Sequence, residues 1–381
     1  MRRRDFLLGL GALLATHMRS YGNWFPPALA KDVNAPRDGS VLIAAAGDTV
    51  LGFNLEAHYD AQLQGGASRE QLGQLYFSGV ADLLSRADLA LVNLECPLTD
   101  RGAVISKNFN FRARPELVEI LKAGSIDVVT LANNHTMDYG AIGMEDTMDT
   151  LTAADIAHFG AGMTLPEARM PAIVERRGLR IGFLGYYFQT AADILEPREL
   201  FATDTTPGVA GCFVDFRCIQ QQIKEDVPPL LARVDAVIPY FHWGKEGSTK
   251  VQPYQIALAH LCIDLGCKAV LGAHPHRLQG IEIYGGAPIF YSLGNFVYGG
   301  RKDPQDKLSA VALLQFGPDR SITAEVVPIQ TTRWPEAPYQ PFLLVGGDRE
   351  EALGRIAELS TGFPATLRML DVYREKIGAR A

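Results

Sequence analysis

The segment Leu271-Gly272-Ala273-His274-Pro275-His276 decides the fold that this sequence predicts. The apolar run Lys268–Leu271 leads into it and predicts a buried strand, so the two histidines stand at the carboxyl end of that strand. In an open α/β sheet, ligands bind at the carboxyl ends of the strands. A turn with two surface histidines is the simpler alternative, and the segments upstream argue against it.

Four further polar clusters follow apolar runs in the same way. They are Gly47-Asp48, Asn93-Leu94-Glu95, Asn133-Asn134-His135 and Phe241-His242-Trp243-Gly244. Carboxylate, carboxamide and imidazole groups together form the donor set of a hydrolytic two-metal centre, in which one carboxylate bridges the ions. The sequence therefore predicts a metal site whose ligands are Asp48, Glu95, Asn134, His242, His274 and His276.

Composition and charge restrict the class of protein. The chain has 381 residues, of which 47% are hydrophobic and 21% charged, and this composition is typical of a globular protein with ample core material. Its length exceeds one ordinary domain without clearly giving two. The formal net charge of −7 provides no basic field, so we expect no nucleic-acid partner.

The cysteines do not form a metal-binding or disulfide-rich pattern. There are five, and none belongs to a Cys-x-x-Cys pair. We expect them to be core thiols. If the protein is exported, Cys212 with Cys218 or Cys262 with Cys267 could form a bridge.

The first 30 residues have the features of an export signal. A basic start, Arg2 to Arg4, precedes the apolar run Phe6–Ala15, which is too short to span a bilayer, and Ala28-Leu29-Ala30 offers a cleavage site. The pair Arg3-Arg4 resembles a twin-arginine signal, with a general secretion signal or a retained anchor as alternatives. We expect an exported protein, either periplasmic or associated with the cell envelope.

Apolar strands and amphipathic helices alternate along the chain, which predicts an α/β fold with a largely parallel sheet. Expected strands are 41–46, 87–92, 126–131, 236–241 and 268–271, with a hairpin at 172–187 and further strands within 278–296, 308–316 and 322–327. Expected helices are 68–86, 115–123, 140–154, 213–231 and 254–265, and the tail from 348 is helical. Residues 188–212 are expected to form an irregular insertion. We divide the chain into an export signal (1–30), one catalytic-type domain (40–330) and a helical extension (331–381).

Six segments in this order resemble the CapA-like capsule-synthesis family. That family is linked to poly-γ-glutamate production and is similar to the calcineurin-like metallophosphoesterases. The segments are Ala46-Gly47-Asp48, Asn93-Leu94-Glu95, Leu131 to His135 with Asp138-Tyr139-Gly140, His242-Trp243-Gly244, Gly272 to His276 and Tyr291 to Phe296. They cover roughly residues 41–300. The resemblance implies a four-layer αββα sandwich with its site between the carboxyl edges of two sheets.

The resemblance also implies a role for each site residue. Asp48, Glu95 and His276 would hold one ion; Glu95 as the bridge, Asn134, His242 and His274 would hold the other. One or two divalent ions, Mn, Fe or Zn, are expected. His135 directly follows Asn134, so it is better placed as a general acid than as a ligand of the same ion. Asp138 is expected to cap the helix that begins near Gly140.

The chain departs from the wider phosphoesterase pattern at two positions. Val50 stands where those enzymes place a metal-binding histidine, and Glu95 replaces the usual bridging aspartate. We therefore expect a tightly held ion near His242 and a labile or absent one near Asp48, unless Asn54 or Glu56 supplies the missing ligand.

The predicted function is that of an exported metal-dependent hydrolase acting on a phosphorylated substrate or an amide-linked anionic polymer. Arg112 and Arg114 could meet such a substrate, or lie on a solvated face. The alternative is a non-catalytic component that holds poly-γ-glutamate in the same pocket and assembles with capsule-synthesis membrane proteins. A degenerate fold that binds no metal is a third possibility.

Overall fold

The computed structural model describes residues 39–191, 193 and 196–363. All of them belong to one compact unit, Gly39–Arg368. The expected export signal and the end of the expected helical tail lie outside the described residues. Within the described part of the chain, no helix is long and apolar enough to cross a membrane.

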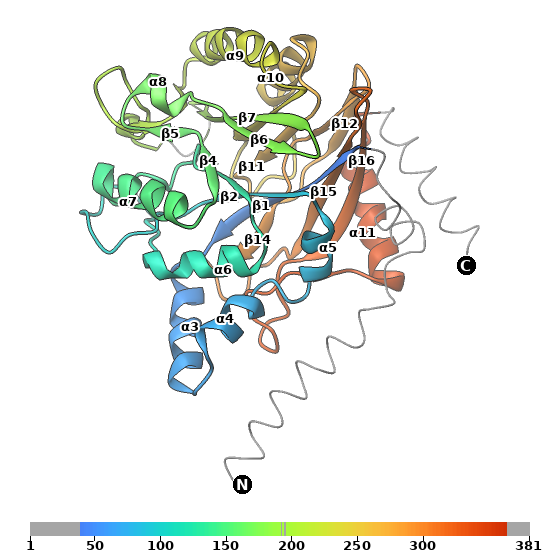
Figure 1. Ribbon diagram of the computed structural model, residues 1–381. Helices are drawn as coiled ribbons and strands as arrows, with labels where there is room; N and C mark the ends of the chain where they lie inside the picture. Colours follow the sequence, from blue (N-terminus) through green and yellow to red (C-terminus); the bar gives the residue numbers. More distant parts are fainter. Residues whose placement is uncertain (1–38, 192, 194–195, 364–381) are drawn as a thin grey trace. The chain divides into compact units, whose positions relative to one another are not determined.

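The first sheet has the order β17-β16-β15-β1-β2-β3-β4, and β14 also pairs with β1. Figure 1 labels β16, β15, β1, β2, β4 and β14 of this sheet. Strands β14, β2, β3 and β4 run parallel to β1, whereas on the other side each neighbouring pair, β1 with β15, β15 with β16 and β16 with β17, is antiparallel. Every residue of β1 is buried, as its continuous apolar run predicts for a strand covered on both faces. The strands are β1 (Val41–Val50), β2 (Leu89–Leu94), β3 (Val128–Thr130), β4 (Ala157–Phe159), β14 (Asn295–Tyr298), β15 (Leu308–Phe316), β16 (Ile322–Gln330) and β17 (Phe342–Leu343).

The second sheet has the order β12-β13-β11-β10-β7-β6, with β9 beside β7. Its central strands β7, β10 and β11 are parallel, and β6 and β7 form the hairpin that the sequence predicts. Its strands are β6 (Ala172–Arg176), β7 (Leu179–Gln189), β9 (Gly211–Phe213), β10 (Ala236–His242), β11 (Val270–Ala273), β12 (Ile281–Tyr284) and β13 (Ala287–Phe290). The short strands β5 (Ala161–Gly162) and β8 (Gly208–Val209) pair separately.

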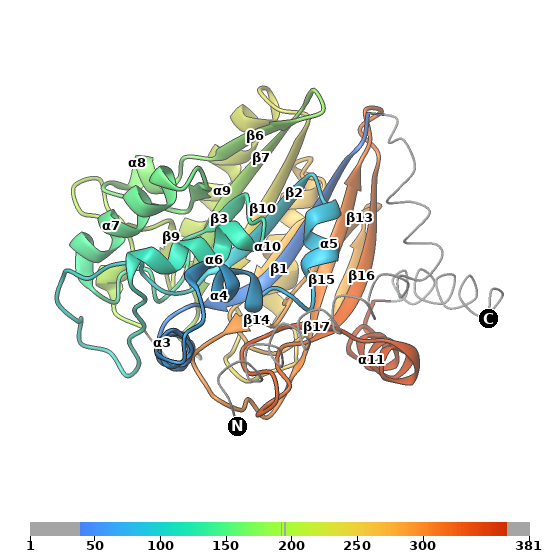
Figure 2. The same cartoon turned by 60° about the horizontal axis from the view of Figure 1, so that its bottom comes forward.

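Helices pack against each sheet. Helices α9 and α10 lie side by side at the top of Figure 1, and Ile223 and Leu258 from them pack with Phe241 of β10 in one core cluster. On the first sheet, Phe77 contacts Phe296 of β14, with ring centroids 5.6 Å apart. Figure 2 shows α11 near β16, which it contacts. The helices are α3 (Asn54–Gln64), α4 (Arg69–Leu75), α5 (Ala81–Arg86), α6 (Val118–Ala123), α7 (Gly140–Ala153), α8 (Leu165–Ala168), α9 (Phe216–Leu231), α10 (Pro253–Asp264) and α11 (Gly346–Leu359), with 3₁₀ turns η1 (Pro115–Leu117) and η2 (Arg198–Leu200).

The two sheets contact each other directly. The Tyr240 hydroxyl of β10 donates a hydrogen bond to the Ala46 carbonyl oxygen of β1 at 2.9 Å. Phe159 of β4 and Phe183 of β7 stack with ring centroids 5.9 Å apart. A methyl group on Gly185 would come within 3.0 Å of Ala132, so glycine permits this close approach. The predicted α/β class is confirmed, and these contacts bring the carboxyl ends of strands from both sheets to one place.

Two predicted segments are wrong in detail. The helix expected over 68–86 is two short helices, because the turn between them carries Gly79, where a Cβ would lie 2.4 Å from the Pro341 carbonyl oxygen. The segment 188–212 is not wholly irregular, since it contains η2, β8 and β9. Those elements are too short to leave a periodic apolar pattern.

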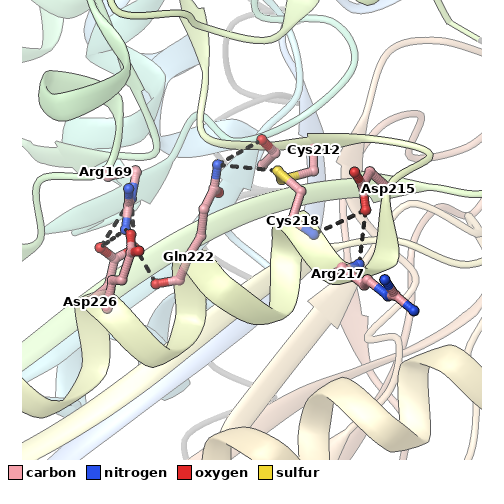
Figure 3. Close-up of a disulfide and its surroundings, with 9 residues drawn as sticks. Arg169, Cys212, Asp215, Arg217, Cys218, Gln222 and Asp226 are labelled. Carbon is pink, nitrogen blue, oxygen red and sulfur yellow. Dashed lines mark hydrogen bonds and ion pairs between the residues drawn. A yellow bond between two sulfur atoms is a disulfide. The ribbon is translucent and has the colours of Figure 1, made fainter.

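Cys212 and Cys218 form a disulfide, which is one of the two bridges named as alternatives, so the expectation of thiols is wrong for this pair (Figure 3). Asp215 caps α9 by accepting hydrogen bonds from the backbone amides of Arg217 and Cys218, and this turn brings Cys218 back to Cys212 in β9. Gln222 reinforces the turn through a hydrogen bond to the Gly211 carbonyl oxygen. The other three cysteines, Cys96, Cys262 and Cys267, are buried thiols as expected.

Candidate metal centre

The six residues predicted as ligands come together at the carboxyl ends of five strands. Asp48 lies in β1, Glu95 directly follows β2, Asn134 follows β3, His242 ends β10, and His274 and His276 follow β11. Asp48, Glu95 and His242 are fully buried. The structure divides these groups into two sets that share Glu95: the first is Asp48, Glu95 and His276, and the second is Glu95, His242 and His274.

The first set surrounds the imidazole of His276. Its Nδ1 atom lies 3.1 Å from Asp48 Oδ2 and 3.9 Å from Glu95 Oε2. Asp48 is itself held in place, because it accepts hydrogen bonds from Asn93 Nδ2 at 2.8 Å and from the His274 backbone amide at 3.2 Å. These two hydrogen bonds, one to each oxygen, fix the orientation of the carboxylate whose Oδ2 faces His276.

The second set surrounds the imidazole of His242. Its Nε2 atom lies 2.8 Å from Asn134 Oδ1, 2.9 Å from His274 Nδ1 and 3.3 Å from Glu95 Oε1. One ring nitrogen carries at most one hydrogen, so it cannot satisfy all three neighbours, whereas a cation can bind several such atoms at once. The geometry of this set suits a cation.

Glu95 provides the test of whether a metal fits. Neither of its carboxylate oxygens has a hydrogen-bond partner among the described residues, although both are buried. Such groups are uncommon in folded proteins and call for an explanation such as a metal ion that binds them. Burial, and then the nearby charge of Asp48, raise the pKa of Glu95 well above its usual range. A divalent cation on either side of this carboxylate would compensate the buried negative charge, so the residues fit a metal centre.

The protonation of the histidines agrees with this arrangement. Burial lowers the pKa of His242 and of His274 well below the usual range, so both imidazoles are neutral, the form that binds metals. Burial also lowers the pKa of His276, but the Glu95 and Asp48 carboxylates outweigh it and raise that pKa to about 10. In the metal-free protein, a proton on His276 therefore supplies positive charge between the two carboxylates.

The backbone holds the two histidines of the central segment in an unusual conformation. His274 has a φ of 101° and His276 a φ of 53°, both in a region that residues with a side chain rarely adopt. Such strain persists where the surrounding structure fixes it, and it is frequent at functional sites. The bend around Pro275 directs one imidazole into each ligand set.

Residues 42–299 match the family described as "Bacterial capsule synthesis protein PGA_cap". The chain belongs to this family. The match covers most of the domain and confirms the resemblance that the six motifs indicate, and the family lies within the metallophosphoesterase-like superfamily.

Curated relatives of this capsule-synthesis family member include a "PGA biosynthesis protein CapA" of Bacillus subtilis, 30% identical over 72% of this chain and 68% of the relative. A "Capsule biosynthesis protein CapA" of Bacillus anthracis is 34% identical over 58% of this chain. A "Probable polyglutamine synthesis accessory protein" of Mycobacterium tuberculosis is 31% identical over 65% of this chain and 67% of the relative. The chain spans about half, 53%, of the Bacillus anthracis relative.

In this PGA_cap domain, His135 forms a pair with Asp138. His135 Nδ1 lies 2.6 Å from Asp138 Oδ2, and the ring packs on Phe111 with centroids 4.2 Å apart. Asp138 does not cap α7 as expected, because its oxygens are occupied by His135, the Phe111 amide and Lys107, and the cap residue is Tyr139. Burial raises the pKa of Asp138 to about 7, against the opposing charge of Lys107. Burial and Lys107 lower the pKa of His135 well below its usual range.

Two residues beside the centre carry no sequence motif. Lys107 is almost fully buried, and its Nζ lies 2.9 Å from Asp138 Oδ1, 3.5 Å from Glu196 Oε2 and 2.6 Å from the Asn134 carbonyl oxygen. Glu196 Oε1 accepts a hydrogen bond from Asn134 Nδ2 at 3.2 Å. Both residues stand in loops without regular spacing, so the sequence gives no signal that singles them out.

The residues considered as replacements for the missing histidine are engaged elsewhere. Asn54 Nδ2 donates to the Gly299 carbonyl oxygen at 3.1 Å, and Glu56 pairs with Arg114 at 2.8 Å. Arg114 also pairs with Asp60, whereas Arg112 is exposed and lies over the Tyr139 ring at 4.7 Å. Of the two arginines, Arg112 has the guanidinium that remains accessible to an anionic substrate.

Proposed function

We propose that this member of the capsule-synthesis family is an exported protein of poly-γ-glutamate or capsule synthesis that carries a metal-dependent, phosphoesterase-like hydrolase site. The observation that carries the proposal is the position of Glu95. Its two buried oxygens lack hydrogen bonds among the described residues and face different ligand sets. A bridging carboxylate between two ions is the defining part of a two-metal hydrolytic centre.

We propose that the fold is the four-layer αββα sandwich of the metallophosphoesterases. Contacts between the sheets through Tyr240 and Ala46, and helices α9 and α10 packed with β10, support this arrangement. The ligands stand at the carboxyl ends of strands from both sheets, which is where α/β folds place their sites.

Bound divalent ions would supply Lewis acidity and a water of lowered pKa at this centre. Asp48, Glu95 and His276 would hold one ion, and Glu95, Asn134, His242 and His274 the other. His135 is the residue proposed to donate a proton to the leaving group. Because burial and Lys107 lower the pKa of His135, its ring is neutral; Asp138, whose pKa is about 7, would pass its proton to Nδ1 as the Nε2 hydrogen is given to the leaving group. Lys107 fixes Asp138 and the Asn134 backbone, so the proton-transferring pair and the ligand loop are positioned together.

The substrate class follows from the chemistry of the site and the names of the relatives. We propose a phosphorylated compound or an amide-linked anionic polymer, with the accessible Arg112 attracting the negative charge. The test is hydrolysis by the purified, metal-loaded protein of a chromogenic phosphodiester and of poly-γ-glutamate, measured in parallel. Turnover of either substrate that disappears on chelation and returns with Mn²⁺ supports the proposal. A metal-loaded protein that hydrolyses neither is not an enzyme of this class.

A non-catalytic role is the second candidate. The relatives are named for synthesis and for an accessory role in it, not for hydrolysis. In this case the same pocket would bind poly-γ-glutamate during assembly, together with capsule-synthesis membrane proteins. Calorimetric binding of the polymer without release of glutamate would favour this role over hydrolysis.

Export is part of the proposal. The disulfide between Cys212 and Cys218 supports it, since disulfides persist in oxidising compartments such as the periplasm. Capsule synthesis, after which the relatives are named, also takes place at the cell envelope. Replacing Arg3 and Arg4 by lysine should hold the precursor inside the cell, because the twin-arginine receptor reads the guanidinium pair. Normal export of that variant would assign the segment to another pathway.

A further inference from the structure

We infer that Asn295 is a protein ligand of the first cation position, the one formed by Asp48, Glu95 and His276. This inference rests on the proposed metal centre and adds a residue to it. The site was expected to lack a fourth protein ligand because Val50 replaces the histidine of related enzymes. In the structure, a carboxamide oxygen from a different strand points into the same set of atoms.

The backbone fixes Asn295 beside Asp48. Asn295 is the first residue of β14, which runs parallel to β1, and its Cα is paired with that of Asp48. The Asp48 amide donates a hydrogen bond to the Gly294 carbonyl oxygen at 2.9 Å. A Cβ on Gly47 would lie 1.8 Å from the same oxygen, so only glycine allows the two strands to approach this closely. The pairing leaves Asn295 buried, with 3% of its surface exposed.

His276 Nδ1 faces more acceptor oxygens than its one hydrogen can bond, and the side chain of Asn295 supplies one of those oxygens. Asn295 Oδ1 lies 2.9 Å from His276 Nδ1, and the same nitrogen is 3.1 Å from Asp48 Oδ2 and 3.9 Å from Glu95 Oε2. Two acceptors, from Asn295 and Asp48, thus lie within hydrogen-bond distance of one ring nitrogen that can donate a single hydrogen bond, and the Glu95 carboxylate faces the same nitrogen at 3.9 Å. A divalent cation binds several oxygens together with an imidazole, so the arrangement resembles a ligand set more closely than a hydrogen-bond pair.

Asn295 also makes the two cation positions chemically different. The first position then has three oxygen donors, from Asp48, Glu95 and Asn295, and one imidazole. The second has two oxygen donors, from Glu95 and Asn134, and two imidazoles, from His242 and His274. Oxygen donors suit Mn²⁺, and imidazoles suit Zn²⁺ and Fe. The first position should therefore prefer Mn²⁺, the harder ion, more strongly than the second position does.

The test measures Mn²⁺ binding to the metal-stripped full-length protein by calorimetry, without any substrate. The wild type should bind two equivalents of different affinity. Asn295→Ala should weaken one of them by about tenfold or more and leave the other unchanged. Asn54→Ala is the matched control, because Asn54, the first residue of α3, is a nearby asparagine whose side chain donates to the Gly299 carbonyl oxygen and not to the centre. Two wild-type equivalents that are unchanged in Asn295→Ala would overturn the inference while leaving the proposed centre intact.

A second variant shows whether the contact is direct and covers the case in which Asn295→Ala does not fold. In Asn295→Cys, Co²⁺ bound at the first position should produce a thiolate charge-transfer absorption in the near ultraviolet. The wild type, which retains its buried thiols, and Asn54→Cys should not show it. Folded Asn295→Cys that binds Co²⁺ without this absorption contradicts a direct contact. A wild type that binds no Mn²⁺ overturns both the inference and the proposed function, whereas a wild type that binds two equivalents without hydrolytic activity overturns the function alone.

Discussion

The side-chain Nδ2 of Asn134 donates a hydrogen bond to Glu196 Oε1 at 3.2 Å, and this turns the side-chain oxygen, Oδ1, toward His242 Nε2 at 2.8 Å. A carboxamide can bind a cation only through its oxygen, so its orientation matters. Glu196 selects that orientation because a carboxylate can accept but not donate. Lys107, 3.5 Å from Glu196, balances the charge of the carboxylate.

Removing the Glu196 carboxylate should weaken cation binding at the second position, the one formed by Glu95, Asn134, His242 and His274. In Glu196→Ala, Asn134 can rotate and present its NH₂ group, so affinity for the more tightly held ion should fall by about ten- to a hundredfold, the usual effect of losing a partner of a ligand. Equilibrium dialysis against Mn²⁺ or Zn²⁺ measures this change. Glu199 lies three residues later, in η2, and is exposed, so Glu199→Ala is the control and should bind as the wild type does. Equal affinities for the two variants would show that Asn134 needs no such partner.

His135 should serve the chemical step more than metal binding. Its Nδ1 side is held by Asp138 at 2.6 Å, and it stands outside both ligand sets. His135→Ala should reduce turnover by about a hundredfold or more, as expected for loss of a general acid. The substrate is whichever of the phosphodiester and poly-γ-glutamate the wild type hydrolyses. Metal content, measured by mass spectrometry, should stay close to that of the wild type. A loss of metal as large as in His242→Ala would instead make His135 a ligand.

Much of this centre could be predicted because its ligands follow strands with clear apolar runs. Asp48, Glu95 and His242 each stand at or next to the end of such a run, and parallel strands must bring those ends to one edge. The residues that could not be predicted act from loops. Lys107 and Glu196 are brought to the centre by tertiary packing, and nothing in their neighbouring sequence marks a contact with Asn134 or Asp138.

The same limit explains the errors in the fold. Helix α3 was not predicted, since only Leu55 and Tyr59 of its residues are buried and its apolar pattern is weak. The role of Asp138 was misjudged because capping is a local rule, whereas its partners Lys107 and Phe111 lie well before it in the chain. The disulfide of Cys212 depends on the turn that Asp215 creates, and two cysteines six residues apart do not reveal that turn.

The Cys212–Cys218 disulfide should stabilise the folded protein by about 2 kcal/mol, because it lowers the entropy of the unfolded chain. The effect is at the low end of the usual range because the loop that it closes is short. The variant that carries both Cys212→Ser and Cys218→Ser should lose about that much free energy of unfolding in urea titrations under oxidising conditions. A reductant should lower the stability of the wild type toward that of the variant and leave the variant unchanged. If reductant leaves the wild type unaffected as well, the bond makes no contribution to stability.

Metal binding at the first position should depend on pH through His276. The Glu95 and Asp48 carboxylates, acting against burial, raise the pKa of His276 to about 10, so this imidazole carries a proton at neutral pH in the metal-free protein. A cation must displace that proton. As pH rises toward 10 the proton is more easily lost, so affinity should increase by up to about tenfold per pH unit between about pH 7 and 9.

The second position should behave differently, because the pKa values of His242 and His274 lie well below their usual range and neither imidazole carries a proton to displace; a proton on Glu95, whose pKa burial raises, is common to both positions. Calorimetry in buffers of different ionisation enthalpy counts the protons released. We expect about one for the first position and far fewer for the second. His276→Gln should weaken the first position and remove its pH dependence while leaving the second unchanged. Parallel pH dependence of both positions in the wild type would contradict the assignment of the proton to His276.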